Sequence, residues 1–345
     1  MVTRRNGDGR VNLSSNELIH PATRGILKSA LAEIDPATVI RYPVTANAIG
    51  AIADLLGLPH SEILITPGSD LAIRAVCWDY QMNHAGSGQL ILQYPNYEAW
   101  EVAARATGLP VRRIEFGDDG PDGQSERFVS AAGESHGSLL AVSVPNGPGG
   151  WVITEDHLSE LIRIAGERSH LLVIDSCYQA FNGSLAGRLE SRGPNVLVIQ
   201  TLSKSHGLAG ARVAFVCGDG ARLDGLGAAN LEETVSGPSL QLAAYLLQSS
   251  GVFEQIWGDI RTIREGATAG LRTGGLEPLP SGGNFVTVKV GTVDDAAEVV
   301  DRLSRAGYRI KNLGSAGMGG YIRFTVGDQR VTAEVVAAVS GATVR

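Results

Sequence analysis

Residues 196–217 read VLVIQTLSKSHGLAGARVAFVC, and this stretch decides the fold. Two apolar, β-branched runs, Asn195–Gln200 and Arg212–Cys217, enclose a polar turn that carries Lys204. Because both runs are continuously hydrophobic instead of alternating, they predict strands that are covered on both faces. Polar turns at strand ends are where parallel sheets place their ligands. We therefore expect Lys204 to lie at the ligand-binding edge of a buried sheet.

Similar runs occur in the first half of the chain. Four of them predict further strands: Glu62–Thr66, Gln89–Tyr94, Ser138–Pro145 and His170–Asp175. Segments of helical period separate most of these runs: Asp70–Asn83, Tyr97–Thr107 and Glu155–Glu167. Strands and helices in alternation predict an α/β domain with a mostly parallel sheet.

The pattern changes after about residue 220. Residues 221–273 read as helical, and the chain beyond them predicts a compact α+β unit. Its expected strands are Asn284–Val290, Tyr308–Ile310 and Tyr321–Val326, and its expected helices are Val293–Ala306 and Thr332–Ser340. Glycine-rich stretches predict loops at Gly117–Gly123, Gly274–Gly283 and Gly314–Gly320.

Composition excludes several classes of function. The net charge of −7 argues against a nucleic-acid-binding surface. No apolar run approaches the roughly 20 residues of a membrane span, and the first ten residues lack the apolar core of a signal peptide, so we expect a soluble, cytoplasmic protein. Three separated cysteines and seven scattered histidines predict reduced thiols and no metal site. Only four of the 29 basic residues are lysines, so lysine chemistry has few candidates.

Polar residues at the strand ends suggest an anion and a carbonyl as ligands. Asp175 ends one apolar run, and such a carboxylate can pair with a buried cation, for example a protonated pyridine nitrogen. Lys204 is followed by Arg212, and a lysine held near another cation has a depressed pKa and forms imines readily. The turn at residues 67–70 enters a helix, whose free N–H groups can bind a phosphate.

These motifs resemble those of the fold-type I, class I/II aminotransferases, above all the histidinol-phosphate aminotransferase group. Residues 201–212 resemble the lysine motif of that family. Eight other segments resemble its motifs in the same order: Asn12–Glu17, Arg41–Pro43, Gly68–Asp70, Pro95–Tyr97, Pro145–Gly150, Asp175–Phe181, Asn284–Phe285 and Ile322–Gly327. The resemblance implies the aspartate aminotransferase-like fold, an α/β large domain (43–265) on a mostly parallel seven-stranded sheet, with a small α+β domain (1–42 and 266–345).

The resemblance also implies pyridoxal 5'-phosphate (PLP) as the cofactor. Lys204 would bind PLP through an imine and move the substrate proton, Asp175 would pair with the pyridine nitrogen, and Tyr178 would hydrogen-bond the ring oxygen. The ring would stack on Tyr97, and the phosphate would be held by Ser69, Asp70, Ser203 and Arg212.

Substrate and partner residues follow from the same resemblance. Arg323 would bind the α-carboxylate of an amino acid, and Lys311 and Asn16 would complete the substrate site. Tyr42 would reach the phosphate of the neighbouring subunit's cofactor, which implies a homodimer.

Two positions depart from the family pattern. Gly147 stands where the family has an asparagine that donates to the cofactor ring oxygen, so either Asn146 or Tyr178 alone would supply that bond. Lys311 stands where the relatives carry an arginine for the substrate phosphate, so the sequence leaves open whether the substrate is phosphorylated.

We therefore expect an aminotransferase that moves an amino group between an amino acid and a 2-oxo acid, in primary or specialised metabolism. Gly147 keeps an alternative open, namely a PLP-dependent decarboxylase, cyclase or oxidase on the same scaffold. A second alternative, a PLP-binding sensor module, is disfavoured by the acidic charge of the chain.

Overall fold

The structure is a computed structural model that describes residues 9–84, 88–185, 193–227 and 234–341. A seven-stranded sheet forms its centre, in the spatial order β2-β8-β7-β6-β5-β3-β4. In that order the strands span Ile63–Thr66, Ala214–Cys217, Val196–Thr201, Leu171–Asp175, Leu139–Ser143, Leu90–Tyr94 and Val111–Glu115. Only β8 runs antiparallel to its neighbours, and the other pairs are parallel. The predicted mostly parallel sheet is therefore confirmed.

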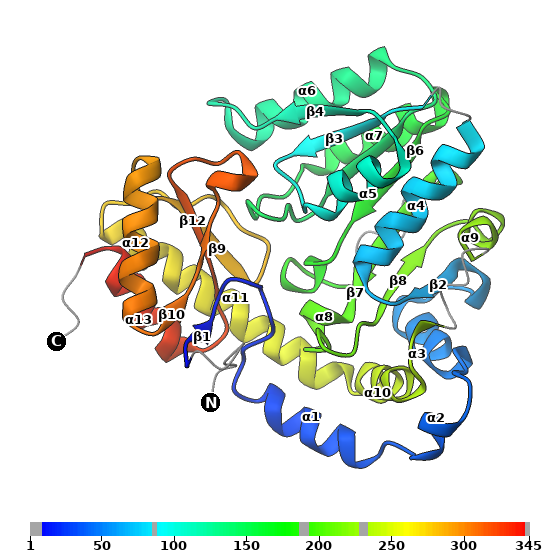
Figure 1. Cartoon of the computed structure of the whole chain (residues 1–345), viewed down its shortest axis with the longest axis horizontal. Helices are drawn as coiled ribbons and strands as arrows, with labels where there is room; N and C mark the ends of the chain where they lie inside the picture. The colour runs from blue at the N-terminus through cyan, green and yellow to red at the C-terminus, as the bar shows by residue number, and fades with distance from the viewer. Residues whose placement is uncertain (1–8, 85–87, 186–192, 228–233, 342–345) are drawn as a thin grey trace.

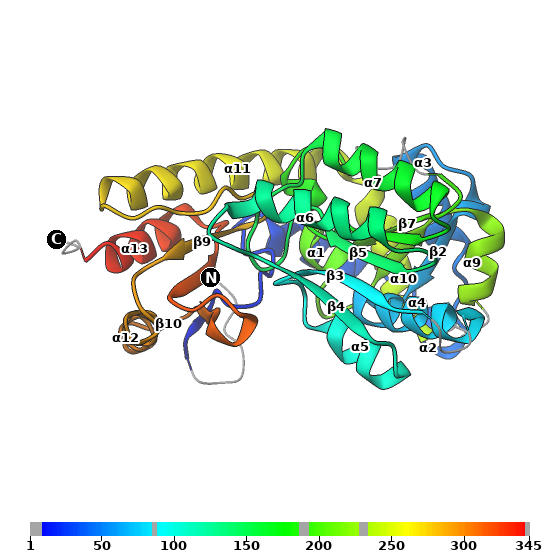
Figure 2. The same ribbon diagram turned by 90° about the horizontal axis from the view of Figure 1, so that it is seen from above.

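Helices cover both faces of this sheet (Figure 2). One face carries α6 (Gly120–Glu134) and α7 (Glu155–Glu167), and the other carries α4 (Ser69–His84) and α5 (Ala99–Thr107). Successive residues of a strand point to opposite faces. Along β6, Leu172 and Ile174 accordingly pack in one hydrophobic cluster, and Leu171 and Val173 pack in the other. This double burial is why the strands read as continuous apolar runs.

A smaller sheet lies beside the large one (Figure 1). It contains β11 (Lys311–Asn312), β12 (Tyr321–Thr325) and β9 (Phe285–Lys289), all antiparallel. Near it, β1 (Val11–Asn12) pairs with β10 (Tyr308–Arg309), so the start of the described chain lies against its C-terminal part. Helices α12 (Val293–Arg305) and α13 (Gln329–Val339) complete this region, and Thr292 and Asp295 form a capping box at the start of α12.

One long helix, α11 (Ser250–Thr273), connects the two regions (Figures 1 and 2). It packs against α13 and β9 of the small region and against the short 3-10 helix η2 (Gln179–Phe181) of the large one. The expected boundary between the large and the small domain, at residues 265 and 266, lies inside this helix. The chain therefore passes from one domain to the other as continuous helix, without a loop.

The remaining elements connect and cover these sheets. They are α1 (Thr23–Ala32), α2 (Ala37–Ile40), α3 (Ala46–Leu56), η1 (His60–Glu62), α8 (Leu202–Ser205), α9 (Gly220–Gly227), α10 (Gly237–Gln248) and η4 (Gly314–Ala316). Among the described residues, no helix combines the length and the apolar character that crossing a membrane requires.

Two elements differ from the sequence-based expectations. The apolar runs predict six strands of the large sheet but not β4, whose residues Val111, Arg112 and Arg113 are exposed at the sheet edge. The glycine-rich stretch Gly117–Gly123 is only partly a loop, because α6 begins at Gly120. Pro121 lies in the first turn of α6, where its missing N–H leaves no helical hydrogen bond unmade.

Candidate active site

Several of the predicted site residues lie at the carboxyl ends of the parallel strands. Asp175 is the last residue of β6, and Lys204 lies in α8 directly after β7. From β3 the chain continues to β4 on one side and then returns to β5 on the other side of β3. Open α/β sheets bind ligands outside the strand ends at such a reversal of strand order. The loop after β3 carries Tyr97, and the loop after β5 carries Gly147.

Lys204 is held by a short helix and has an unusual pKa. The Thr201 hydroxyl accepts a hydrogen bond from Ser203 N–H at 3.2 Å, which caps α8. The Lys204 ammonium donates to the backbone carbonyl of Ser15 at 2.6 Å. Burial and then the charge of Arg323 lower the pKa of Lys204 from 10.5 to about 8. About a tenth of this amine is therefore neutral at pH 7, far more than for an ordinary lysine, which suits it to imine formation.

Asp175 is buried at the end of β6, next to Cys177. Its side chain is buried, and Oδ1 accepts a hydrogen bond from Cys177 N–H at 3.2 Å. Burial raises the pKa of Asp175, so a cationic partner would be needed to stabilise its charge. The Cys177 thiol lies within hydrogen-bonding reach of Asp175 and Ser69, and burial raises its pKa well above the ordinary value. A thiol that keeps its proton is a poor nucleophile, so the burial of Cys177 favours a packing role.

Tyr178 is fixed on several sides. Its ring packs edge-on against Phe285, with centroids 5.1 Å apart. Its hydroxyl accepts a hydrogen bond from Asn16 Nδ2 at 2.9 Å. A Cβ atom at Gly147 would lie 3.0 Å from Tyr178 Cε2, so the missing side chain leaves room for this ring position. Burial raises the pKa of Tyr178, so the phenol keeps its proton and can donate it in a hydrogen bond.

Arg323 lies on β12 of the small sheet, and its charge is close enough to Lys204 and Tyr178 to lower the pKa of both. Its Nη2 donates to the Ser14 carbonyl at 2.9 Å, and its guanidinium lies 5.2 Å from the Phe285 ring centroid. Its Nε is buried and has no hydrogen-bond partner within the described part of the chain. Lys311 on β11 is directly opposite Arg323 in the antiparallel register. Directly opposed residues point to one face of a sheet, so an exposed second cation flanks Arg323.

A second cluster forms at the start of α4. The Asp70 carboxylate accepts a hydrogen bond from the Tyr97 hydroxyl at 2.7 Å and pairs with Arg212 at 2.9 Å. Gly68 makes this approach possible, because a Cβ there would lie 2.3 Å from Arg212 Nη2, and its φ of 88° also favours glycine. Ser69 begins the helix, so unpaired backbone N–H groups face this cluster.

Two other predicted residues lie differently. Asn146 is fully buried, and its Nδ2 donates to Gln93 Oε1 at 3.1 Å and to the Pro95 carbonyl at 3.0 Å. Both of its donors are thus engaged by β3 and the loop after it, and its cofactor contact stays a prediction without support from these bonds. Tyr42 follows α2 and is 93% exposed, so within one chain it does not take part in the site.

The residues that the sequence did not single out are Ser14 and Ser15. They act through backbone carbonyls, on Arg323 and Lys204 respectively. Every residue type offers a carbonyl, so no sequence signal could have indicated them.

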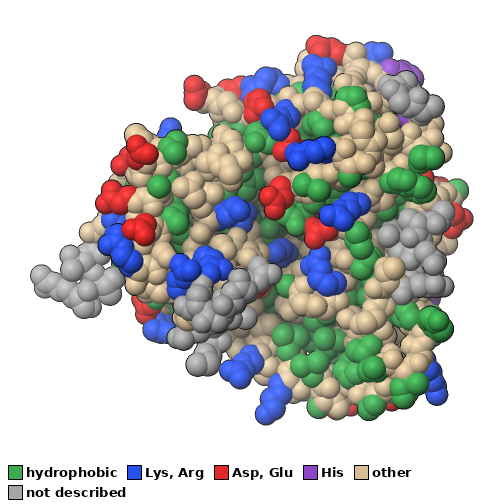
Figure 3. All heavy atoms as spheres, in the orientation of Figure 1, with side chains coloured by type: hydrophobic (Ala, Val, Ile, Leu, Met, Phe, Trp, Pro, Cys, Tyr) green, Lys and Arg blue, Asp and Glu red, His purple; other side chains and the backbone are tan. Residues whose placement is uncertain are grey.

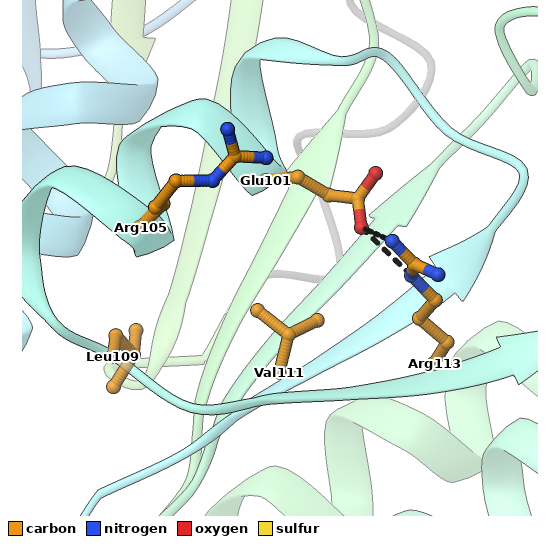
Figure 4. A pocket seen from close by; sticks show the side chains of 5 residues that line it. All are labelled: Glu101, Arg105, Leu109, Val111 and Arg113. Atoms are coloured by element: carbon orange, nitrogen blue, oxygen red, sulfur yellow. Dashed lines mark hydrogen bonds and ion pairs between the residues drawn. The ribbon is translucent and has the colours of Figure 1, made fainter. Parts of the chain in front are cut away.

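A separate hollow of about 440 Å³ lies on the outer side of the large sheet (Figure 4). Its side chains come from α5 and the start and middle of β4 and from the loop between them: Glu101, Arg105, Leu109, Val111 and Arg113. The Arg113 guanidinium pairs with Glu101 in this hollow. None of the predicted site residues lines it, so it is distinct from the site at the strand ends.

The residues at the strand ends suit PLP. PLP needs an amine for its aldehyde, a carboxylate for its pyridine nitrogen, a hydroxyl for its ring oxygen and N–H groups for its phosphate. Lys204, Asp175 and Tyr178 offer the first three, and the start of α4 offers the last. The Ser203 hydroxyl is buried without a hydrogen-bond partner among the described residues, as expected of a group that a ligand would complete.

Comparisons with known proteins point the same way. The family model for aminotransferase class I and II matches residues 9–339. A histidinol-phosphate aminotransferase of Geobacter sulfurreducens is 29% identical over 282 residues, covering 80% of this chain and 77% of that protein. An aromatic amino acid aminotransferase of Rhodococcus jostii is 28% identical, and the match covers 94% of this chain and 88% of that protein. The structure of histidinol-phosphate aminotransferase from Sinorhizobium meliloti in complex with PLP superposes with a TM-score of 0.78 at 21% identity, over 96% of this chain and 90% of that one.

Proposed function

The chain belongs to the class I and II aminotransferase family, whose enzymes depend on PLP, and on that premise we propose which of its residues perform amino transfer. One observation carries the proposal. Lys204 is an amine with a pKa lowered to about 8, and the charges of Arg323 and Arg212 contribute to that shift. A phosphate-bearing cofactor and an amino acid each bring an anionic group. A site for both therefore needs two cations beside the nucleophilic amine.

We assign the reacting groups as follows. PLP, when bound, supplies an electron sink for the bond that breaks at the substrate Cα. Lys204 binds the cofactor aldehyde and later carries the substrate Cα proton. Asp175 holds the proton of the pyridine nitrogen, and a cationic partner would offset the burial that now raises the pKa of this carboxyl. Tyr178 donates its hydroxyl proton to the ring oxygen.

The cluster at the start of α4 is assigned to the phosphate and the ring. Ser69 and Asp70 offer backbone N–H groups at a helix start, where anions are stabilised, and Ser203 offers a hydroxyl that has no partner among the described residues. Arg212 adds a cation, which Asp70 holds in place through their ion pair. Tyr97 is half-exposed and tethered to the same Asp70, so its ring is available to stack on a planar ligand.

Arg323 is assigned to the α-carboxylate of the substrate. Its guanidinium donates one N–H to the Ser14 carbonyl, and its buried Nε has no partner among the described residues. A substrate carboxylate can therefore accept two hydrogen bonds from the remaining N–H groups. Lys311 lies on the same face and would attract an anionic group elsewhere on the substrate. The two named relatives act on histidinol phosphate and on aromatic amino acids, and Lys311 is the residue that would distinguish phosphorylated from uncharged side chains.

We also propose a homodimer in which Tyr42 reaches the partner's phosphate site. Tyr42 is exposed, and so are the apolar side chains of Leu31, Val39, Ile40 and Val44, which lie on or next to α1 and α2. Figure 3 shows hydrophobic side chains gathered over α1, α2 and α10, at the lower edge of the molecule. Contiguous apolar surface of this kind is typical of a subunit interface.

A screen for half-reactions tests these assignments. Holoenzyme is mixed with single amino acids, with and without a phosphate on the side chain, while the absorbance of the bound cofactor is recorded. Conversion to the aminated form of the cofactor by at least one donor is expected. Arg323→Gln should weaken donor binding, whereas Lys311→Gln should weaken only donors with an anionic side chain. Release of carbon dioxide or uptake of oxygen without amination of the cofactor would instead favour the decarboxylase or oxidase alternative.

A further inference from the structure

Asn16 has a backbone conformation that needs an explanation. Its φ is 53°, in the left-handed region that non-glycine residues seldom adopt, and its side chain is only 1% exposed. Asparagine tolerates this region better than most residues but still rarely adopts it in a buried segment. Such conformations persist where the surroundings determine them, and they cluster at functional sites.

Two neighbouring side chains, Thr325 and Asn284, hold Asn16 in this conformation. Its backbone N–H donates to Thr325 Oγ1 at 3.1 Å, and the same hydroxyl lies 3.3 Å from Asn16 Oδ1. The single proton of the Thr325 hydroxyl is shared between Asn16 Oδ1 and the Leu13 carbonyl, which is nearer at 2.9 Å, and Asn284 Nδ2 donates to the Asn16 carbonyl at 3.1 Å. Because Oδ1 faces the Thr325 hydroxyl, the amide NH₂ group must point the other way. It points at the Tyr178 hydroxyl, at 2.9 Å.

The direction of that hydrogen bond decides what Tyr178 can do. A phenol has one proton, and an oxygen that accepts from an amide NH₂ group must place its own proton elsewhere. Gly147 on the neighbouring loop has no side chain that could make a second bond to a ring oxygen. The Asn16 hydrogen bond and the nearby charge of Arg323 both lower the pKa of Tyr178, against the larger effect of burial.

We propose that Asn16 is a positioning residue that acts through Tyr178, fixing the phenol so that its proton is donated toward the ring oxygen of the cofactor. This inference rests on the proposed function, because it assumes that PLP binds beside Lys204. It gives Asn16 a different task from the substrate contact that the sequence motif implies. In this chain one tyrosine, oriented by Asn16, takes over the hydrogen bond that a side chain at position 147 cannot make.

A double-mutant cycle with Tyr178→Phe tests the inference. Asn16→Gly removes the amide and keeps a residue that tolerates a φ of 53°, so folding should survive. Asn16→Asp keeps the size but replaces the donor with an acceptor. Each variant is loaded with PLP, and the pH midpoint of the cofactor absorbance, the dissociation constant for PLP and the thermal unfolding midpoint are measured.

The expected results separate positioning from structure. A hydroxyl that donates to the ring oxygen stabilises negative charge there, so losing its orientation should move the absorbance midpoint upward. We expect a shift of about one pH unit and an about tenfold slower half-reaction for Asn16→Gly and Asn16→Asp, the equivalent of one hydrogen bond. In the Tyr178→Phe background, Asn16→Gly should add nothing. Equal shifts in both backgrounds, or no shift in either, would overturn the inference. If the unmodified protein gave no PLP absorbance at all, the proposed function itself would fail instead.

Discussion

Replacing Arg323 with glutamine should raise the pKa of Lys204 and slow its reaction with PLP at neutral pH. Burial and the charge of Arg323 are the two largest causes that hold this pKa at about 8 instead of 10.5. A pKa of about 8 leaves about a tenth of the amine neutral at pH 7, roughly 300 times more than the ordinary value would. Only the neutral amine attacks an aldehyde, so the binding rate follows this fraction.

The size of the effect follows from the same relation. Each pKa unit that Lys204 regains lowers its neutral fraction at pH 7 by about tenfold. Because burial remains in the variant, we expect only part of the shift to be reversed, with binding about three- to tenfold slower at pH 7. Above a pH of about 10 the two proteins should react at nearly the same rate, because the amine is mostly neutral in both.

The assay is the rate of the absorbance change after apo-protein is mixed with PLP, measured between about pH 6 and pH 11. Lys311→Gln is the matched control, because it removes one positive charge from the neighbouring strand at an exposed position directly opposite Arg323. A wild-type midpoint near the ordinary value of 10.5, or a midpoint that Arg323→Gln leaves unchanged, would refute the reasoning.

Four further predictions concern the cofactor, two glycine positions and the acid stability. Asp175→Asn keeps the shape of the side chain but removes the charge that a pyridinium needs, so equilibrium titration should show PLP binding about a hundredfold weaker. Gly149→Ala should destabilise the fold by about 1–3 kcal/mol in thermal unfolding, because its Cβ would lie 1.7 Å from the Trp151 ring. Gly266→Ala, within α11 and with no described atom in the way, should instead stabilise it by about 1 kcal/mol. Burial lowers the pKa of His206 from 6.5 to about 3, so the unfolded chain binds the extra proton between these values and stability should fall as the pH drops through them. His206→Phe should flatten that part of the pH dependence, and an unchanged slope would contradict this account.

The large sheet was predictable where its strands are buried on both faces. The runs that became β6 and β7 are hydrophobic at nearly every position, because alternate residues belong to two different hydrophobic clusters. Among the described strands, the edge strand β4 pairs with β3 alone. Its exposed Arg112 and Arg113 interrupt the apolar pattern, so the sequence does not predict a strand there. Tertiary pairing with β3, and not local sequence, makes this segment a strand.

The sequence motifs indicate residue types for the candidate site but not its internal contacts. Motif order indicated Asp175, Lys204 and Arg323, and the structure places these three side chains around one region. The sequence did not indicate that Asn16 adopts a left-handed conformation, because Thr325 and Asn284 impose it from 309 and 268 positions away in the chain. Contacts of that kind depend on the assembled fold.

The consecutive residues 14–16 have a consequence for how ligands bind. The carbonyl of Ser14 holds Arg323, the carbonyl of Ser15 holds Lys204, and Asn16 holds Tyr178. A ligand that binds one of these three side chains replaces its hydrogen bond to residues 14–16. The segment that also restrains the other two side chains is then less firmly held. Binding events that share such a restraint are cooperative, and the coupling is reciprocal. The apo-protein should therefore bind a simple carboxylate more weakly than the PLP-loaded protein does, even though Arg323 is present in both.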